Sequence, residues 1–215
     1  RALINSISAE EKRLEEFMPL AKKYGAAVLC LPLDDKGVPE TAKDRVEVIR
    51  RIIKAGLEHG LKEEDFLLDA LVMTVSAAPY AALETLDTLK RYRQEFGYPA
   101  MFGLSNVSFG LPRRNLLNGS FLSMAMYAGL DAAIMNPFDE VVMDSWLAAN
   151  ALVGHDKQGI YYSQKYIDSI DNARTVIQVA ENIDIISQIK KSVMVGEKSS
   201  VVPLVKKAIT EGHTV

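Results

Sequence analysis

The sequence has few of the residues that build disulfides or metal sites. A single cysteine, Cys30, excludes a disulfide within the chain and fits a reducing cytoplasm. Cys30 lies in an apolar stretch, which is typical of an inert core residue. The three histidines are too scattered for the spacing of a zinc site: His59, His155 and His213. We therefore expect a cytoplasmic protein with no metal site of its own.

Long apolar runs and a large charge of one sign are also missing. Charged side chains interrupt every apolar stretch before it reaches the roughly 20 residues of a membrane helix. Arg1 to Ser6 lead straight into a charged segment, so no secretory signal is visible. The 215 residues are 48% hydrophobic and 25% charged with a net charge of -3, as in an ordinary soluble globular protein. A nucleic-acid partner would favour a basic face, so we expect neither nucleic acid nor a membrane as a partner.

The chain does contain a repeated alternation of two patterns. Short apolar runs that end in polar residues predict β-strands at 3–6, 26–32, 66–69, 101–108 and 131–136. Each run precedes a longer stretch with helical spacing, near 8–25, 41–59, 80–96, 115–128 and 138–152. Glycines stand where three of these helices should end: Gly25, Gly60 and Gly129. Five strand–helix units thus occupy about 153 residues.

Strict alternation of strands and helices predicts a parallel sheet and an α/β fold. A complete TIM (β/α)8 barrel needs about 250 residues, so we interpret 1–153 as the C-terminal five strand–helix units of such a barrel. The missing units would leave unpaired edges beside the strands that contain Ile4 and Ile134. We expect that the protein continues upstream or that a partner chain covers these edges. Two copies would supply ten strands rather than eight, so dimerisation does not simply complete the barrel, although a homo-oligomer of another kind stays open.

A change of pattern after Gly154 predicts a second module. The polar stretch Asp156 to Gly159 is typical of a linker. Helical spacing returns at 166–191 and, after Gly196, at 201–210. We therefore predict a partial barrel, a linker and α-helical segments, at 1–153, 154–165 and 166–215.

Polar side chains directly follow four of the predicted strands: Asn5, Asp69, Asn106 and Asn136. The carboxyl ends of barrel strands converge on one mouth, where ligands bind. The run from Gly103 to Gly110 is the most informative, because its small polar groups face a loop at a helix start. Plainer interpretations stay open: Asn106 could cap the following loop, Asp69 could cap a turn, and Asn5 could satisfy backbone groups.

Several motifs together resemble a known family. The motifs are Arg1 to Ser6, Gly103 to Ser108, Leu117-Asn118 and Gly129 to Ile134. Their order and spacing are similar to those of the pterin-binding barrel of methyltetrahydrofolate methyltransferases, over residues 1 to about 152. The segments 189–197 and 204–212 are similar to the opening of the helical cap of a cobalamin-binding module.

This resemblance implies an enzyme that transfers the N5-methyl group of methyltetrahydrofolate to a cob(I)alamin or other corrinoid cofactor. It implies a cobalamin held mainly by residues beyond this chain, with a corrinoid-binding domain and a homocysteine-binding domain as partners. Phe109 and Asn136 favour the methionine synthase branch, which would place the reaction in methionine synthesis. Two alternatives stay open: a methyltransferase that serves a corrinoid iron–sulfur protein, and a non-catalytic corrinoid or docking protein that keeps a barrel remnant.

The resemblance also implies the site residues. It assigns Asn106 as the catalytic residue near the pterin N5. It places an arginine in the loop after the strand that leads to Asn106, and Arg114 matches that position. The glutamate tail of the folate is anionic, so Arg113 and Arg114 would suit it electrostatically. A second pterin-binding carboxylate of the family belongs to a strand that these residues lack. The implied substrate-binding residues are Asn5, Asp69, Gly103, Ser105, Ser108, Arg114 and Asn136.

These residue types suit the expected chemistry. The leaving group is the N5 amine, which leaves readily only when it is protonated or hydrogen-bonded. A neutral amide such as Asn106 can make that hydrogen bond without adding a charge that must be desolvated. The pyrimidine edge of a pterin displays adjacent N–H donors, and one carboxylate such as Asp69 can accept both in charge-assisted bonds.

Overall fold

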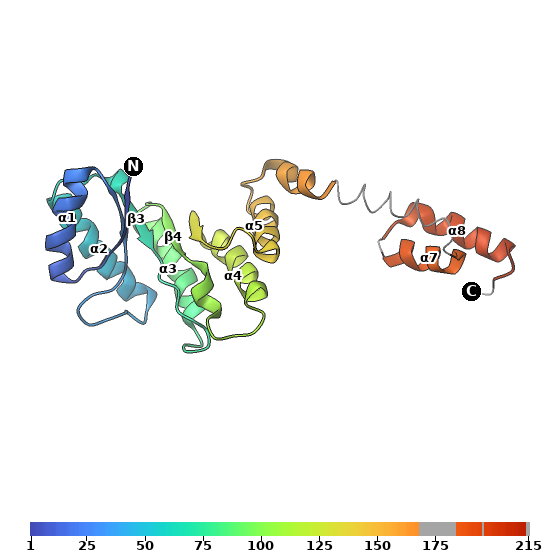
Figure 1. Cartoon of the computed structure of the whole chain (residues 1–215), viewed down its shortest axis with the longest axis horizontal. Helices are drawn as coiled ribbons and strands as arrows, with labels where there is room; N and C mark the ends of the chain where they lie inside the picture. The colour runs from blue at the N-terminus through green and yellow to red at the C-terminus, as the bar shows by residue number, and fades with distance from the viewer. Residues whose placement is uncertain (168–183, 195, 214–215) are drawn as a thin grey trace. The chain divides into compact units, whose positions relative to one another are not determined.

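The computed structural model describes residues 1–167, 184–194 and 196–213. The chain forms two compact units, Arg1–Tyr162 and Ser163–Val215 (Figure 1). Most of the helix expected at 166–191 lies outside the described residues.

The first unit alternates strands and helices in the predicted order. Its five strands are parallel and each pairs with the next, so that β1 and β5 form the edges of one sheet. The α/β fold is therefore confirmed, and the topology is consistent with five units of a TIM barrel. The strands are β1 (Leu3–Ile7), β2 (Ala27–Cys30), β3 (Phe66–Asp69), β4 (Ala100–Gly103) and β5 (Ala132–Ile134). The helices are α1 (Glu11–Tyr24), α2 (Ala42–Glu58), α3 (Ala81–Glu95), α4 (Arg114–Ala128) and α5 (Glu140–Leu152).

Local chemistry explains where several helices begin and end. The Thr41 side-chain oxygen accepts a 3.2 Å hydrogen bond from the N–H of Asp44, which caps the start of α2. Gly25 ends α1 and Gly129 ends α4 with φ of 61° and 108°. A residue with a side chain would be strained in this left-handed region, so glycine stops both helices.

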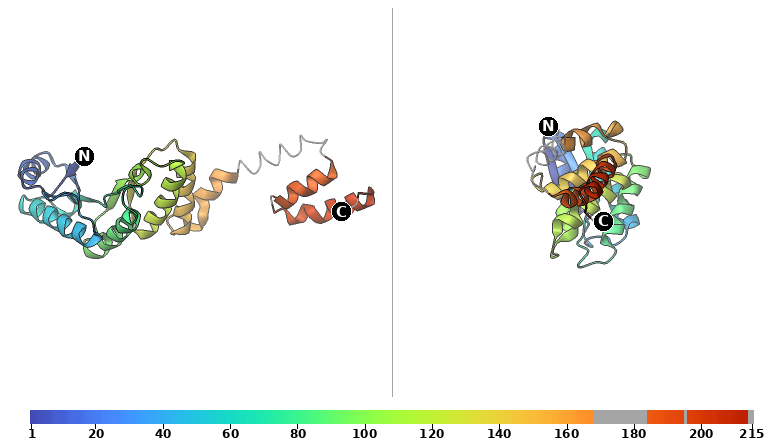
Figure 2. Two further views of the ribbon diagram at one scale, coloured as in Figure 1. Left: turned by 90° about the horizontal axis from the view of Figure 1, so that it is seen from below. Right: turned by 90° about the vertical axis from the view of Figure 1, so that its right-hand side faces the viewer.

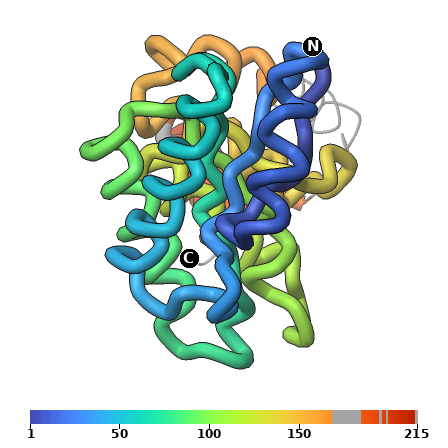
Figure 3. The backbone as a smooth tube through the Cα atoms, turned by 90° about the vertical axis from the view of Figure 1, so that its left-hand side faces the viewer, coloured from blue at the N-terminus to red at the C-terminus, as the bar shows by residue number. Residues whose placement is uncertain are grey.

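One face of the sheet packs against the helices. Alternate strand residues such as Val28, Phe66 and Phe102 are at most 1% exposed. Phe102 stacks on Phe121 of α4, with ring centroids 5.5 Å apart. Helices α1 to α5 follow one another along this face, each in contact with the next (Figures 2 and 3). The hydrophobic core therefore lies between the sheet and the helices.

The other face of the sheet is open toward its edges. Leu29 and Met101 are buried near its centre, whereas Leu3 on β1 and Ile134 on β5 are 42% and 54% exposed. In a complete barrel this face lines the interior, where side chains pack in layers. An open five-stranded sheet leaves these apolar edge residues uncovered.

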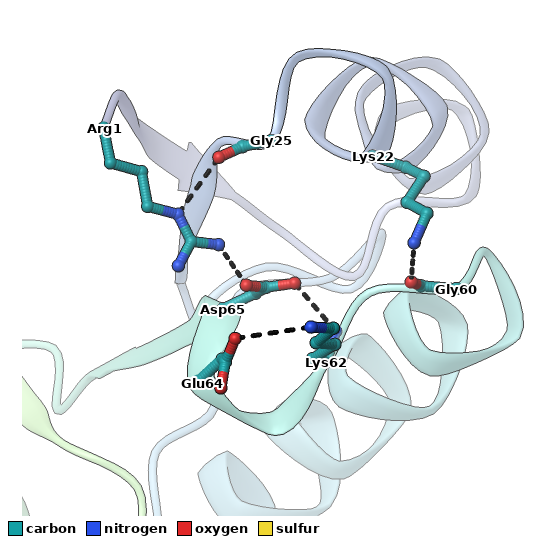
Figure 4. Close-up of polar contacts among 7 residues, drawn as sticks. All are labelled: Arg1, Lys22, Gly25, Gly60, Lys62, Glu64 and Asp65. Carbon is teal, nitrogen blue, oxygen red and sulfur yellow. Dashed lines mark hydrogen bonds and ion pairs between the residues drawn. The ribbon is translucent and has the colours of Figure 1, made fainter.

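Polar contacts join the N-terminal ends of the first three strands (Figure 4). The Arg1 guanidinium donates to the carbonyl of Gly25 at 3.0 Å and to Oδ1 of Asp65. Oδ2 of Asp65 accepts a 2.7 Å hydrogen bond from the backbone N–H of Lys62. Arg1, Gly25 and Asp65 lie just before β1, β2 and β3. These contacts therefore stabilise the end of the sheet opposite to the one where barrel enzymes bind ligands.

In the described part of the second unit, α7 (Ile185–Met194) and α8 (Lys198–Thr210) lie side by side (Figure 1). Ile185 and Ala208 are buried. Within the predicted linker, residues 157–159 form a 3-10 turn and helical geometry begins at Ile160. Among the described residues, no helix is both long and apolar enough to cross a membrane.

Candidate functional site

Strand register brings Asn5 and Asp69 to the same face of the sheet. Asn5 pairs with Leu29, which in turn pairs with Leu67. Asp69 follows Leu67 by two residues, so all of these side chains point away from the helices. In an eight-stranded barrel with a shear of 8, the stagger is about one residue per strand. Asn5 and Asp69 lie two strands apart and are offset by two residues. They therefore lie at the same level of a barrel.

Asp69 is half-buried at the end of β3. Its Oδ1 accepts a 2.8 Å hydrogen bond from the N–H of Leu71. Burial raises the pKa of Asp69 to about 6, although the Leu71 N–H and the positive charge of Arg45 favour the ionised form. Asp69 is therefore mostly ionised at neutral pH and titrates in weakly acidic solution.

The chain leaves the sheet earlier than predicted after β4. The strand expected at 101–108 is wrong in its second half, because β4 ends at Gly103 and residues 104–108 form a 3-10 turn. Ser105 and Asn106 are exposed on this turn. Serine and asparagine favour turns because their side chains compete for backbone hydrogen bonds, which outweighs the apolar start of the run.

Asn106 folds back over the end of β4. A Cβ added to Gly103 would lie 3.4 Å from Nδ2 of Asn106, an ordinary contact distance, so this amide lies beside Gly103. The Asn106 side chain is exposed and makes no hydrogen bond within the part of the chain that the structure describes. Asp69 pairs with Met101, and Gly103 follows Met101 by two residues, so Gly103 shares the open face with Asp69.

A hydrogen-bond network links the turn after β4 to the start of α4. The fully buried hydroxyl of Ser108 donates to Oδ1 of Asn118 at 2.7 Å. The Arg114 guanidinium donates to Oγ of Ser108 at 3.0 Å and to the carbonyl of Ser105 at 2.6 Å. It also lies over the ring of Phe109, 5.9 Å from its centroid. These contacts hold an exposed positive charge at the first turn of α4.

A cavity of about 190 Å³ lies between this turn, α4 and the loop after β5. Three of the predicted residues line it: Ser105, Arg114 and Asn136. Asn118 and Asp139 also belong to its wall. Oδ1 of Asn136 accepts a 3.1 Å hydrogen bond from the backbone N–H two residues later, so this side chain also shapes its own turn. The volume is below the roughly 300–1,000 Å³ of most ligand pockets and suits only part of a folate.

The predicted residues thus fall into two groups. Asn5, Asp69 and Gly103 share the open face of the sheet, with Asn106 folded against Gly103. The second group is the network around the cavity, Ser105, Ser108, Arg114 and Asn136. Asn5, Asp69 and Asn106 do not line that cavity.

Two buried polar residues near the site were not among the expected site residues, although Asn118 belongs to one of the motifs that carry the family resemblance. Arg45 is 2% exposed and Asn118 is 8% exposed. Arg45 lies four residues before Ile49 and seven before Ile52, on the apolar stripe of α2. An arginine on a helix is usually exposed to solvent. The helical spacing of Arg45 with these isoleucines is the signal in the sequence that could have predicted its burial. Asn118 occupied the apolar face of α4 in the same way.

Cys30 lies fully buried on β2, and burial raises its pKa far above the ordinary value. Its thiol is therefore protonated and inert, as expected of a core cysteine. Within the described ranges, no group of three or more histidine, cysteine, aspartate and glutamate side chains could hold a metal ion.

The sequence is similar to those of several known proteins. A methylcorrinoid:tetrahydrofolate methyltransferase of Eubacterium limosum is 30% identical over 169 residues, which cover 76% of this chain and 62% of that protein. Methionine synthases of Mycobacterium leprae and Mycobacterium tuberculosis are 34% and 33% identical over 151 and 149 residues. Each of these two matches covers 63% of this chain and 12% of the synthase. The chain therefore spans less than two thirds of the length of each relative.

A family profile gives the broader assignment. The profile of the pterin binding enzymes matches residues 1–136, which is more than half of the chain. The matched region contains all five strands of the sheet and every residue predicted for the site. This chain belongs to the pterin binding enzyme family.

Proposed function

We propose that the first unit binds the pterin of methyltetrahydrofolate for transfer of its N5-methyl group to a corrinoid. The observation that carries this proposal is the strand register, which puts Asn5, Asp69 and Gly103 on one open face. Family membership supports a pterin as the ligand of that face. The relative from Eubacterium limosum, a methylcorrinoid:tetrahydrofolate methyltransferase, supports a corrinoid as the other methyl carrier.

Asp69 is the group that recognises the pyrimidine edge of the pterin. Its carboxylate accepts the adjacent N–H donors of that edge, and such charge-assisted bonds are stronger than neutral ones. The Leu71 N–H occupies Oδ1 in part and orients the carboxylate. Asn5, at the same barrel level, supplies an amide to the same ring.

Asn106 acts at the reacting nitrogen. Its amide donates a hydrogen bond to N5, and this bond strengthens as the methyl group leaves and negative charge develops on N5. A proton from water then neutralises N5, and the reverse reaction releases this proton to water. Gly103 lies directly beside this amide, since a Cβ at position 103 would be 3.4 Å from Nδ2 of Asn106. Asn106 needs no change of charge to work in either direction of the reaction.

The network around the cavity holds the rest of the folate. Arg114 offers its exposed positive charge to the anionic glutamate tail, and Ser108 and the Ser105 carbonyl hold this guanidinium in place. Asn136 and Ser105 line the neighbouring cavity, where they bind polar groups of the substrate.

The corrinoid supplies a cobalt atom that accepts or donates the methyl group. We expect residues beyond this chain to hold it, in a corrinoid-binding domain whose helical cap begins in 166–215. A barrel at 1–153 and a linker at 154–165 complete this proposed division. A homocysteine-binding domain would be a further partner in methionine synthesis.

Two finer assignments have support. Phe109, Asn136 and the mycobacterial relatives favour the methionine synthase branch. The relative from Eubacterium limosum favours exchange between tetrahydrofolate and a methylcorrinoid protein, and its match covers more of this chain. The same residues serve both, because a catalyst of a reversible step acts in both directions. Activity with homocysteine as final acceptor separates the two.

Isothermal titration of the full-length parent protein with methyltetrahydrofolate tests the proposal. We expect saturable binding that Asp69→Asn weakens at least tenfold, because a neutral amide accepts these hydrogen bonds more weakly. Asp35→Asn, an exposed carboxylate on the loop after β2, is the matched control and should bind normally. Transfer to added cob(I)alamin is followed by the change in corrinoid absorbance. Absence of folate binding by the wild-type protein would overturn the proposal.

A further inference from the structure

A buried arginine holds the backbone that follows Asp69. Arg45 of α2 is 2% exposed, and its Nη1 donates to the carbonyls of Ala70 and Leu71 at 3.2 and 3.0 Å. Its Nε donates to the carbonyl of Pro39 at 3.2 Å. One guanidinium therefore ties the loop after β2 to the end of β3.

Two buried hydroxyl groups of α3 act on the same backbone. Oγ1 of Thr85 lies 3.0 Å from the carbonyl oxygens of both Leu71 and Ala81, which share its single proton. Tyr92 donates to the carbonyl of Asp69 at 3.2 Å. Both side chains are 0% exposed. We call Arg45, Thr85 and Tyr92 the strand-end clamp.

The clamp holds a conformation that the chain does not favour by itself. Leu71 has a φ of 53°, in the left-handed region, where a non-glycine residue is strained by about 1 kcal/mol or more. In this conformation its N–H reaches Oδ1 of Asp69. The strand-end clamp donates hydrogen bonds to the backbone carbonyls of this turn and so stabilises it. Because the Leu71 N–H in this turn binds Oδ1 of Asp69, the clamp also fixes the direction of the Asp69 carboxylate.

A neutral donor would satisfy these carbonyls at less cost than an arginine. Removing a guanidinium from water is unfavourable, and burial lowers the pKa of Arg45. The positive charge has a second effect, because it attracts the nearby carboxylate of Asp69. Arg45 therefore acts on Asp69 through its positive charge, which a neutral hydrogen-bond donor at the same place would lack.

We propose that Arg45 is a positioning residue for Asp69 and acts, together with Thr85 and Tyr92, to present the carboxylate to the pterin. The proposal rests on the proposed function, in which Asp69 binds the pterin. Arg45 does not touch the substrate, and its effect reaches the ligand through Asp69.

The charges around Asp69 give this role a pH signature. Asp69 interacts electrostatically with Arg45 on α2 and Tyr92 on α3. Arg45 also interacts with Glu84 of α3, and Tyr92 with Cys30 of β2. Burial raises the pKa of Tyr92 and of Cys30, so both remain neutral. Loss of the Arg45 charge therefore raises the pKa of Asp69. Pterin binding needs the ionised carboxylate of Asp69. The pH at which binding is half lost on the acidic side should therefore rise from about 6 in the wild type to a higher value in a variant without the Arg45 charge.

A double-mutant cycle on the full-length parent protein tests the proposal by titration with methyltetrahydrofolate. We expect Arg45→Met to weaken binding about tenfold or more at pH 7, because a misplaced carboxylate loses its geometry. In the Asp69→Asn background the same change should matter less than about twofold, since Arg45 acts through Asp69. Arg45→Lys, which keeps the charge, should recover part of the affinity. Arg50→Met, an exposed arginine of the same helix, is the control.

Tyr92→Phe carries the same test if Arg45→Met does not fold, because it removes only the hydroxyl group. We expect a loss of about threefold that disappears in the Asp69→Asn background. Equal losses in both backgrounds, without a shift in the pH midpoint, would show a merely structural role and overturn the proposal. Unchanged affinity in Arg45→Met and Tyr92→Phe would also overturn it. Failure of the wild-type protein to bind folate would instead overturn the proposed function, and this inference with it.

Discussion

The buried hydroxyl of Ser108 donates a 2.7 Å hydrogen bond to Oδ1 of Asn118, ten residues further along the chain. This pair fastens the turn after β4 to α4, and Arg114 donates to the same hydroxyl oxygen. The position of the Arg114 charge therefore depends on a serine that is itself inaccessible to solvent.

Ser108→Ala should destabilise the first unit by about 1–3 kcal/mol, because it leaves Oδ1 of Asn118 buried without its donor. Urea unfolding measures the loss. Ser105→Ala is the control, since its side chain is exposed and Arg114 uses only its carbonyl, and should stay within about 0.5 kcal/mol of wild type. Equal losses in the two variants would contradict this account of the network.

Gly119→Ala should force α4 and α5 apart. A Cβ at this position would lie 2.3 Å from Oγ of Ser145 and 3.3 Å from the carbonyl of Val141. Such overpacking costs about 1–3 kcal/mol, measured by thermal unfolding. Adding Ser145→Ala removes the closest atom and should recover part of the loss, whereas Ser120→Ala on the exposed side should change little. No recovery in the double variant would contradict the steric explanation.

Asp65→Asn should destabilise the protein without affecting folate. Although burial disfavours the charge, the Lys62 N–H and the Arg1 guanidinium lower the pKa of Asp65 below its ordinary value. This contribution is present above about pH 4 and is lost as the pH falls through the lowered folded pKa. We expect a loss of about 1–2 kcal/mol at pH 7 by urea unfolding, since Arg1 is partly exposed.

Folate affinity should be unchanged in Asp65→Asn, because Asp65 lies at the N-terminal end of the strands. Glu64→Gln removes an exposed ion pair with Lys62 at 3.7 Å and serves as the control (Figure 4). If Asp65→Asn bound folate more weakly than the wild type, the ligand would lie at the N-terminal end of the strands, contrary to the proposed site.

Asp69→Asn should stabilise the protein while it weakens folate binding. Burial raises the pKa of Asp69 from 3.8 to about 6, so the stability of the wild type falls as the pH rises across this range. The variant should match the wild type near pH 4 and exceed it at pH 7 by at most about 3 kcal/mol, less any screening by water. Urea unfolding at the two pH values measures this, and a difference independent of pH would contradict it.

Asn106→Ala should lower the rate of methyl transfer more than the affinity for folate. The proposed hydrogen bond to N5 strengthens mainly in the transition state, so kcat should fall about 100-fold while the dissociation constant changes only a few-fold. Single-turnover transfer to cob(I)alamin gives the rate, and titration gives the affinity. A loss of affinity as large as the loss of rate would assign Asn106 to ground-state binding.

Local patterns were sufficient for most of the architecture. Alternating apolar runs and helical stretches predicted all five parallel strands, and Gly25 and Gly129 marked two helix ends correctly. The failure at 104–108 has a local cause, because the apolar start of that run hid the turn preference of its serines and asparagine.

The sequence by itself determined the α/β alternation and the polar residues at the strand ends, since periodicity and capping depend on near neighbours. Only the tertiary structure decided that Asn5 and Asp69 share a face, because register arises from pairing between distant segments. It also decided the partners of Arg45, whose carbonyl acceptors directly after β3 lie 25 and 26 residues away. A buried charge must find its hydrogen bonds wherever the packed chain provides them.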